Sequence, residues 1–483
     1  MATAIDRVKA ILNTLKIRGI YPTGYLGSGG QCDVVQGIID PRLVDAATLV
    51  EMFTARRAHE MMEDKRRSKV YNVDDYRQMA RNEAQGLNPN VLRRYVDENI
   101  FERFLHKSTK QSRAGGALYT CAIKAYKSNM QDFRVEREKR ASGFSHPHGA
   151  YILFVSNGDR QSAAKNKVAV LERVTPMPAA ARESLTLEDY LGIGIQAARF
   201  LEVFHEHGLF HRDIKPENII ITESGNAKIV DYGNIVHDSS DKAAQLLTQT
   251  VDGKLFVTTA YAAPEQVHSA KDVNGRTDMY SLAATIYYWI TGGKFANQAP
   301  HGEDEAFAKT KKEAFFKNLM FMTPLSRDMY HRPVSVLRLK DCYGDAVSDE
   351  ERKIAVGQTL RNLERTLSGM MNIEVDRRYD DIKQAREDLE AVLRGKKPAN
   401  VAGKVKELGI GMDHYIKETF ADENPTIHPF EYTDVPEMPS ESKSYARLAL
   451  AALTGTAAGL GIASCIYGVD NVCNAIKYLF TGN

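Results

Sequence analysis

Two short polar runs in the middle of the chain have the residue types and spacing of a catalytic centre. Residues 211–218 read His-Arg-Asp-Ile-Lys-Pro-Glu-Asn, and residues 229–233 read Ile-Val-Asp-Tyr-Gly. They hold the carboxylates of Asp213 and Asp231, which are 231 − 213 = 18 residues apart, and the amide of Asn218. A positioned carboxylate can orient a hydroxyl group and accept its proton. Carboxylate and amide oxygens are also ligands that suit Mg²⁺ bound to phosphates. These residues therefore favour chemistry on a hydroxyl group and a metal-bound phosphate.

The first run resembles the catalytic loop of eukaryotic-type serine/threonine protein kinases, and the second resembles their metal-binding motif. The first run matches without a substitution, and the two motifs stand at the family distance. The resemblance implies that Asp213 is the catalytic base and that Asn218 and Asp231 hold Mg²⁺ or Mn²⁺ on ATP. Lys215, two residues after Asp213, is the choice of serine/threonine kinases and is also expected to act in catalysis. Each residue alone would suit a buried histidine or a surface ion pair, but the agreement of motif and context favours the site.

A glycine-rich segment near the N-terminus resembles the kinase loop that covers the phosphates of ATP. Residues 25–35 read Tyr-Leu-Gly-Ser-Gly-Gly-Gln-Cys-Asp-Val-Val. Glycines let the backbone of such a loop lie close to phosphates. Cys32 stands at the third glycine position, and its side chain is expected to weaken or reshape this cover. A tolerated small residue is the favoured interpretation of Cys32, and a redox switch is the alternative. By resemblance, the nucleotide contacts from this segment are Leu26, Gly27, Gly29 and Val34.

An alternating stretch further on resembles the third strand of the small lobe, and its lysine is Lys124. By resemblance Lys124 bridges the α- and β-phosphates, and Ala122 contacts the nucleotide. The acidic partner of this lysine is expected on the following helix, in a Phe-Arg-Val-Glu-Arg-Glu run. Glu136 is the first choice because it fits a Phe-Arg-x-Glu pattern. Glu138 stays open as the alternative, since only one of the two can face the lysine.

Residues 168–174 read as a strand that, by resemblance, ends in the hinge that binds adenine through its backbone. Leu171 then stands at the gatekeeper position. Glu172 and Val174 offer hinge groups to the nucleotide. Ile220, in the short strand after the catalytic loop, is expected to form the floor of the adenine pocket.

Further motifs extend the resemblance through the second half of the chain. Residues 258–265 read Thr-Thr-Ala-Tyr-Ala-Ala-Pro-Glu and resemble the end of the activation segment. Asp278 fits the buried aspartate that holds the catalytic-loop backbone, and Arg378 fits the arginine that pairs with Glu265. Arg212 precedes the catalytic aspartate, and in the family such an arginine often pairs with a phosphate on the activation segment. The candidate phosphate acceptors are Ser239, Ser240, Thr248, Thr250 and Thr259.

The order of these motifs predicts an α+β, two-lobed protein kinase fold over residues 21–395. The small lobe is expected to be an antiparallel β-sheet with one helix, and the large lobe to be mainly helical. Residues 1–20 have apolar residues at helical spacing and predict an amphipathic helix. A second insertion is expected at about 302–355, because that stretch is longer and more charged than the family needs.

A helical insertion is expected in the small lobe at about 38–116. Val34 and Lys124 are 124 − 34 = 90 residues apart, which is much farther than the family requires. Apolar residues recur at helical spacing inside this segment. Two interpretations stay open: a helical insertion without a functional role, or a regulatory or partner-binding element beside the ATP site.

The C-terminal part of the chain separates into a linker and a hydrophobic segment. Residues 396–443 are rich in proline and predict a linker. Residues 444–483 predict a hydrophobic helix, and 448–468 carry no charge over a length that suits a membrane span. The segment is also rich in small residues, so a helical tail packed on protein stays open as the alternative to a membrane span. The expected location is therefore a cytoplasmic kinase domain, with a C-terminal membrane anchor as one alternative.

Composition narrows the class of partner. The net charge of +2 gives no case for a nucleic-acid partner, and 43% hydrophobic with 26% charged residues is typical of a globular protein. The five cysteines lack metal-ligand spacing and do not suggest a disulfide framework. The resemblance implies transfer of the γ-phosphoryl of Mg-ATP to Ser or Thr of protein substrates, the chain itself included. The alternative is a pseudokinase scaffold that binds nucleotide and partners without efficient transfer. Nucleotidyl transfer would require a rearranged catalytic loop, which this sequence lacks.

Overall fold

A computed structural model gives the architecture of the chain in separate stretches. The described residues are 2–28, 32–64, 73–109, 116–127, 132–156, 167–237, 261–268, 274–290, 359, 362–363, 365–372 and 375–400. Several predictions fall outside them: the role of Gly29, the candidate phosphate acceptors, the insertion at 302–355, and nearly all of the linker and C-terminal segment.

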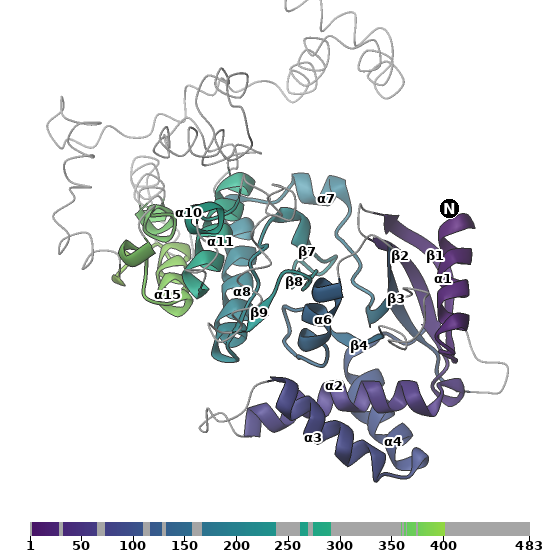
Figure 1. The fold of residues 1–483 in the computed structure, drawn as a ribbon. Helices are drawn as coiled ribbons and strands as arrows, with labels where there is room; N and C mark the ends of the chain where they lie inside the picture. Colours follow the sequence, from purple (N-terminus) through teal and green to yellow (C-terminus); the bar gives the residue numbers. More distant parts are fainter. Residues whose placement is uncertain are drawn as a thin grey trace, which may run out of the picture. The chain divides into compact units, whose positions relative to one another are not determined.

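Five antiparallel strands form one sheet in the order β1-β2-β3-β5-β4 (Figure 1). Along β2, buried residues alternate with half-buried ones, as expected when one face of a sheet packs on a core and the other is partly solvated. The strands are β1 (Ile20–Ser28), β2 (Cys32–Ile39), β3 (Tyr119–Tyr126), β4 (Ile152–Ser156) and β5 (Val168–Glu172).

Two helices flank this sheet. Helix α1 (Ala2–Thr14) lies within the segment predicted as an N-terminal helix, and its residues Val8 and Ile11 are buried in the sheet's core cluster. Helix α6 (Asp132–Ala141) follows β3 and is the helix expected to carry the acidic partner of Lys124. Sheet and helices together give the small lobe an α+β construction.

The connection between β2 and β3 is a helical insertion. Ile39 and Tyr119 are directly paired across the two strands, so the chain leaves and returns at one point of the sheet. The start of its third helix is set by Asn88, whose side chain accepts a hydrogen bond from the backbone N–H of Asn90. Towards the end of the insertion, Ile100, Phe101 and Leu105 are buried in the core of the sheet. Its elements are η1 (Pro41–Leu43), α2 (Ala46–Asp64), α3 (Val73–Gln85), α4 (Pro89–Val96), η2 (Asp97–Phe101) and α5 (Glu102–Phe104).

The second half of the chain is mainly helical. Its long helix α8 begins with a reciprocal capping box, in which Thr186 and Asp189 each bond the other's backbone N–H. Short antiparallel strand pairs, β6 with β9 and β7 with β8, carry the loops between them. The elements are α7 (Ala179–Glu183), α8 (Leu187–Glu206), β6 (Leu209–Phe210), η3 (Pro216–Asn218), β7 (Ile219–Ile221), β8 (Ala227–Ile229), β9 (Val236–His237), α10 (Pro264–His268), α11 (Gly275–Ile290), η7 (Val375–Arg377) and α15 (Ile382–Leu393).

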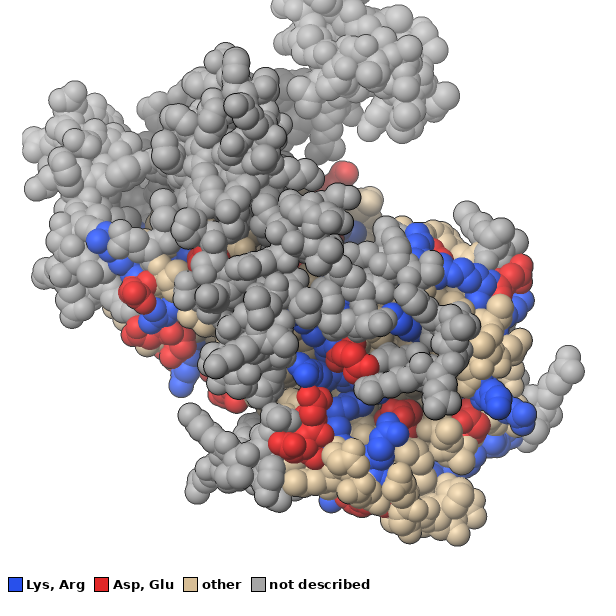
Figure 2. All heavy atoms as spheres, viewed as in Figure 1, with Lys and Arg blue, Asp and Glu red and all other residues tan. Residues whose placement is uncertain are grey.

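The α+β class predicted from the sequence is thus confirmed. On the face drawn in Figure 2, basic and acidic side chains of the described residues are interspersed. Within the stretches that the structure describes, no helix has both the length and the apolar character needed to cross a bilayer. Residues 448–468, where the sequence suggests a span, lie outside those stretches.

Candidate active site

Lys124 lies at the centre of a buried charge cluster that joins a strand, a helix and a loop. Its Nζ is 3.0 Å from Oε2 of Glu138, on α6, and 2.9 Å from Oδ1 of Asp231, which follows β8. The Lys124 side chain is only 10% exposed. One ammonium group therefore connects residues 14 and 107 positions away in the sequence.

The structure corrects the first choice of acidic partner from Glu136 to Glu138. Glu136 is exposed, whereas Glu138 is buried and also accepts a hydrogen bond from the hydroxyl of Tyr126. Two residues along a helix turn the side-chain direction by about 200°, so the two glutamates cannot face the same way. The buried Val135, three positions before Glu138, shares its face of the helix.

The charges of the cluster favour an ionised Asp231. The ammonium of Lys124 lowers the pKa of Asp231 below its usual range, against the effect of burial. Burial by itself would lower the pKa of Lys124, but the carboxylates of Asp231 and Glu138 outweigh it and raise that pKa. For Glu138, burial raises the pKa while Lys124 opposes the rise. The arrangement keeps a protonated lysine beside an ionised aspartate.

Asp213 is held by three side-chain donors. Both of its carboxylate oxygens accept hydrogen bonds from Nζ of Lys215 at 3.0 Å. The amide of Asn218 donates to Oδ2 at 3.1 Å, and the amide of Asn234 donates to the same oxygen at 3.2 Å. Burial raises the pKa of Asp213, and Lys215 opposes the rise. The sequence motifs did not include Asn234; its place three residues after Asp231 was the available signal.

Asp278 of α11 holds the backbone of residues 211–212, as predicted. Its carboxylate accepts hydrogen bonds from the backbone N–H groups of His211 at 2.8 Å and Arg212 at 2.6 Å. His205, which the motifs did not include, has its Nε2 2.9 Å from the same carboxylate. Arg212 and Asp231 have backbone φ angles of 65° and 64°. These lie in the left-handed region, which residues other than glycine rarely adopt. Such backbone strain is found mainly at functional sites.

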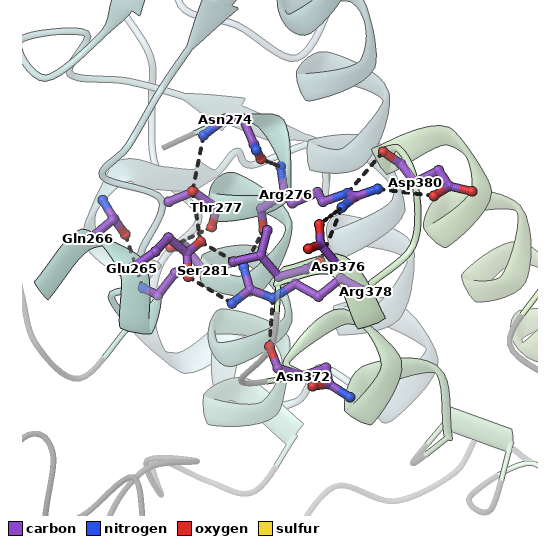
Figure 3. Close-up of polar contacts among 12 residues, drawn as sticks. Glu265, Gln266, Asn274, Arg276, Thr277, Ser281, Asn372, Asp376, Arg378 and Asp380 are labelled. Atoms are coloured by element: carbon purple, nitrogen blue, oxygen red, sulfur yellow. Dashed lines mark hydrogen bonds and ion pairs between the residues drawn. The ribbon is translucent and has the colours of Figure 1, made fainter. Parts of the chain in front are cut away.

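The predicted pair of Glu265 and Arg378 is also present (Figure 3). The guanidinium of Arg378 donates to both carboxylate oxygens of Glu265, at 2.8 and 2.9 Å. Thr277 donates to the same carboxylate at 2.9 Å, and Arg378 also donates to the backbone oxygen of Asn372. Arg378 is fully buried. This network ties the Ala-Pro-Glu segment to α11 and to the residues before η7.

The glycine-rich strands and Lys124 are neighbours. Val34 of β2 pairs with Gly27 on one side and with Lys124 on the other. Leu26 is 45% exposed. Ala122, in β3, pairs with the predicted gatekeeper, Leu171. Nucleotide contact by these residues remains a prediction.

Glu172, predicted to lie in the hinge, has partners of its own. The carboxylate of Glu172 lies 2.5 Å from Nζ of Lys228, and its backbone N–H donates to the oxygen of Tyr151. Val174, the other residue predicted to offer hinge groups, is half-buried. Ile220 is half-buried in β7. Adenine binding here is likewise a prediction.

The predicted metal ligands, Asn218 and Asp231, lie on two segments that are joined by a hydrogen bond. The backbone N–H of Val230 donates to the oxygen of Asn218 at 2.9 Å, which places the residue before Asp231 against the end of η3. Among the described residues, no group of three or more His, Cys, Asp or Glu side chains could hold a metal. One carboxylate with one amide suits a Mg²⁺ ion that takes its other ligands from phosphates and water.

Comparison with known proteins agrees with this geometry. A family model described as "Protein kinase domain" matches residues 169–380. Residues 169–380 of this chain are thus a protein kinase domain. The kinase domain is 38% identical over 109 residues to a probable serine/threonine-protein kinase of Clostridium perfringens, covering 23% of this chain and 15% of that protein. It is 30% identical over 182 residues to PknA, a serine/threonine-protein kinase of Mycobacterium tuberculosis, covering 35% of this chain and 40% of that one.

A third relative is the serine/threonine-protein kinase PknL of Mycobacterium tuberculosis. It is 37% identical over 92 residues, which is 19% of this chain and 21% of PknL. The chain thus spans less than half the length of each of these three curated relatives. The α+β fold described above is the two-lobed fold of the kinase family.

Proposed function

We propose that this chain is a serine/threonine protein kinase that transfers the γ-phosphoryl group of Mg-ATP to hydroxyl groups of proteins, itself included. The observation that carries the proposal is the buried bridge of Lys124 between Glu138 and Asp231. It stands beside an Asp213 carboxylate that three donors hold in place. A structural ion pair alone would not require both features together.

Each group has a role in the proposed reaction. Lys124 neutralises charge on the α- and β-phosphates, and Asn218 with Asp231 would hold the Mg²⁺ that enters with ATP. The substrate hydroxyl oxygen forms a bond to the γ-phosphorus while the bond from that phosphorus to the departing ADP oxygen breaks. Asp213 orients the hydroxyl and takes its proton. Most of the rate enhancement would come from positioning and charge neutralisation.

The proposed acceptor class is supported by Lys215 and by the relatives. Lys215 bonds the catalytic carboxylate directly, so it is placed to stay near the transferred group as well. The three relatives reported above carry the name serine/threonine-protein kinase. The Ala-Pro-Glu segment, held by Arg378, is the part of the family fold that forms a platform for protein substrates.

Transfer of radiolabel from γ-labelled Mg-ATP tests the proposal. The wild-type chain is compared with Asp213→Ala and Lys124→Met, with the chain itself and a generic basic protein as acceptors. Label in the wild type alone, recovered as phosphoserine or phosphothreonine, is the expected result. Nucleotide binding without transfer would support the scaffold alternative instead. Transfer from α-labelled ATP would overturn the assigned reaction.

Membrane attachment through residues 448–468 stays a separate prediction of the sequence. Partitioning of the full-length chain into detergent is compared with that of a chain ending at Ser442. An anchor requires that only the full-length chain enters the detergent phase. Equal partitioning of the two would contradict it.

A further inference from the structure

The last turn of α6, the helix that carries the acidic half of the Lys124 pair, is held by the helical insertion. His59, on α2, donates from Nε2 to the backbone oxygen of Arg140 at 3.2 Å. The guanidinium of Arg140 is 3.0 Å from the carboxylate of Asp74, on α3. Arg77, also on α3, donates to Oγ of Ser142 at 3.0 Å. Two helices of the insertion thus bind the end of one short helix.

The contacts of His59 and Arg77 are buried, whereas the Arg140–Asp74 pair is partly exposed. Arg77 is 9% exposed, His59 is 1% exposed and Ser142 is fully buried. A buried guanidinium is costly to keep unless it is hydrogen-bonded, so the Arg77 bond to Ser142 constrains where the end of α6 can lie. In Figure 1 the insertion helices α2 and α3 lie side by side, close to α6.

The chain just after α6 turns directly on α2. Gly143 has φ of +86°, and a Cβ atom added there would lie 2.0 Å from the backbone oxygen of Ala55. Phe144 then packs edge-on against His59, with ring centres 5.7 Å apart, and against Phe204 of α8 at 5.2 Å. The end of α6 is therefore fixed between the insertion and the main helix of the large lobe.

The C-terminal end of α6 lies close to the Lys124–Glu138 pair. Glu138 is two residues before Arg140 on a helix of 10 residues, so the two residues lie about 3 Å apart along the helix axis. Its carboxylate is 3.0 Å from Lys124 Nζ, and a hydrogen bond is lost beyond about 3.5 Å. A small rotation of α6 at its C-terminal end is enough to separate Glu138 from Lys124.

We propose that Arg77 and His59 are positioning residues of the phosphoryl-transfer site, and that they act through α6 to keep Glu138 against Lys124. The insertion then has a role at the active site: it acts as a brace, which means that it holds α6 in the position that the site requires. This inference rests on the proposed function, because the Lys124 pair matters through its role at the phosphates of ATP.

A double-mutant cycle on the full-length chain tests the coupling. Arg77→Gln, Glu138→Gln and the double variant are compared with wild type by two readouts. The first is the dissociation constant of Mg-ATP, measured by displacement of a fluorescent ATP analogue. The second is kcat and KM for phosphoryl transfer. Arg57→Gln is the matched control, because Arg57 joins α2 to α3 through Glu83 and, among the described residues, does not bond to α6.

Arg77→Gln is expected to weaken Mg-ATP binding and to lower kcat/KM, each by about fivefold or more. In the Glu138→Gln background it should cause no further loss, because the group it positions is already gone. Arg77→Lys should recover part of the loss, and Arg57→Gln should behave like wild type. A residue that only stabilises the fold would reduce activity equally in both backgrounds.

Two results would overturn the inference: no effect of Arg77→Gln on either readout, or losses that multiply in the double variant. If Arg77→Gln does not fold, Ser142→Ala replaces it in the same cycle, since it removes the Oγ acceptor and leaves the guanidinium. A wild-type chain that binds Mg-ATP but transfers no phosphate would overturn the proposed function alone. The binding cycle would then still decide whether the brace exists.

Discussion

Lys215 and Asp213 form the contact that most directly couples this site to pH. In the proposed reaction Asp213 must be ionised to accept a proton, so activity is expected to fall as pH drops through its pKa. Burial raises that pKa and Lys215 opposes the rise. Lys215→Gln should therefore move the acidic limb of the pH profile to higher pH. The check is kcat/KM measured from about pH 4 to pH 8.

The exposed Lys9 of α1 provides the control for this experiment. Lys9→Gln removes a charge of the same sign far along the sequence from the catalytic loop and should leave the limb in place. An unchanged limb in Lys215→Gln would mean that Lys215 does not set the charge state of Asp213.

Single residues also show where sequence patterns stop. The catalytic loop could be placed by its residue string, because its function fixes both residue types and spacing. The choice between Glu136 and Glu138 depended on which face of α6 is buried, and a motif does not contain that information. Asn234 was not predicted for a similar reason. A single amide can bond Asp213 only when the fold brings the two together, and no motif marks it.

At the scale of elements, α1 is bonded to the glycine-rich hairpin. Arg7 pairs with Asp33 of β2 and donates to the backbone oxygen of Tyr126 at 2.6 Å. Asp33 also accepts a hydrogen bond from Ser28, at the end of β1. Arg7→Gln should loosen the hairpin and raise KM for ATP about threefold, with little change in kcat. Steady-state kinetics with varied ATP measure this, and a kcat effect without a KM effect would contradict it.

Helix α2 carries a second element-scale prediction, on stability. Burial, followed by the positive charges of His207, Arg77 and Arg56, lowers the pKa of His59 to about 3 from 6.5, although its bond to Arg140 opposes the shift. Between these values the unfolded chain binds a proton that the folded chain does not. Stability is therefore lost as pH falls, by about 2 kcal/mol between pH 7 and pH 5 from this group.

His59→Gln keeps a donor for the Arg140 oxygen but cannot titrate. Its free energy of unfolding in urea should fall less than that of wild type between pH 7 and pH 5. His106→Gln, at an exposed histidine, is the matched control. Identical pH dependence in His59→Gln and wild type would show that His59 is not buried as a neutral ring.

At the scale of the whole molecule, the Glu265–Arg378 pair links parts of the chain 113 residues apart. Arg378→Met would leave a buried carboxylate without its main partner and should cost about 3–5 kcal/mol of stability. The double change Glu265→Leu with Arg378→Met should recover part of that loss, because no buried charge remains. Urea unfolding of the three chains measures both effects. A loss that is not smaller in the double variant would contradict the account.

The architecture was largely predictable, because the kinase motifs occur in a fixed order and each belongs to a known element. The insertion was placed at about 38–116, and the strands that bound it end at Ile39 and begin at Tyr119. Spacing along the chain revealed its length and helical character. Its packing on the end of α6 could not be predicted, because it depends on buried contacts such as Arg77 with Ser142, between residues 65 positions apart.

The same insertion has a consequence for folding kinetics. In a plain hairpin β2 and β3 would pair across a short turn, but here the first pair, Ile39 and Tyr119, is separated by 119 − 39 = 80 residues. Closing that loop costs about 3 kcal/mol more entropy than closing a two-residue turn. The cost is reduced if α2 to α5 fold first and bring the strand ends together. The central sheet is therefore expected to form late, with the insertion serving as its folding template.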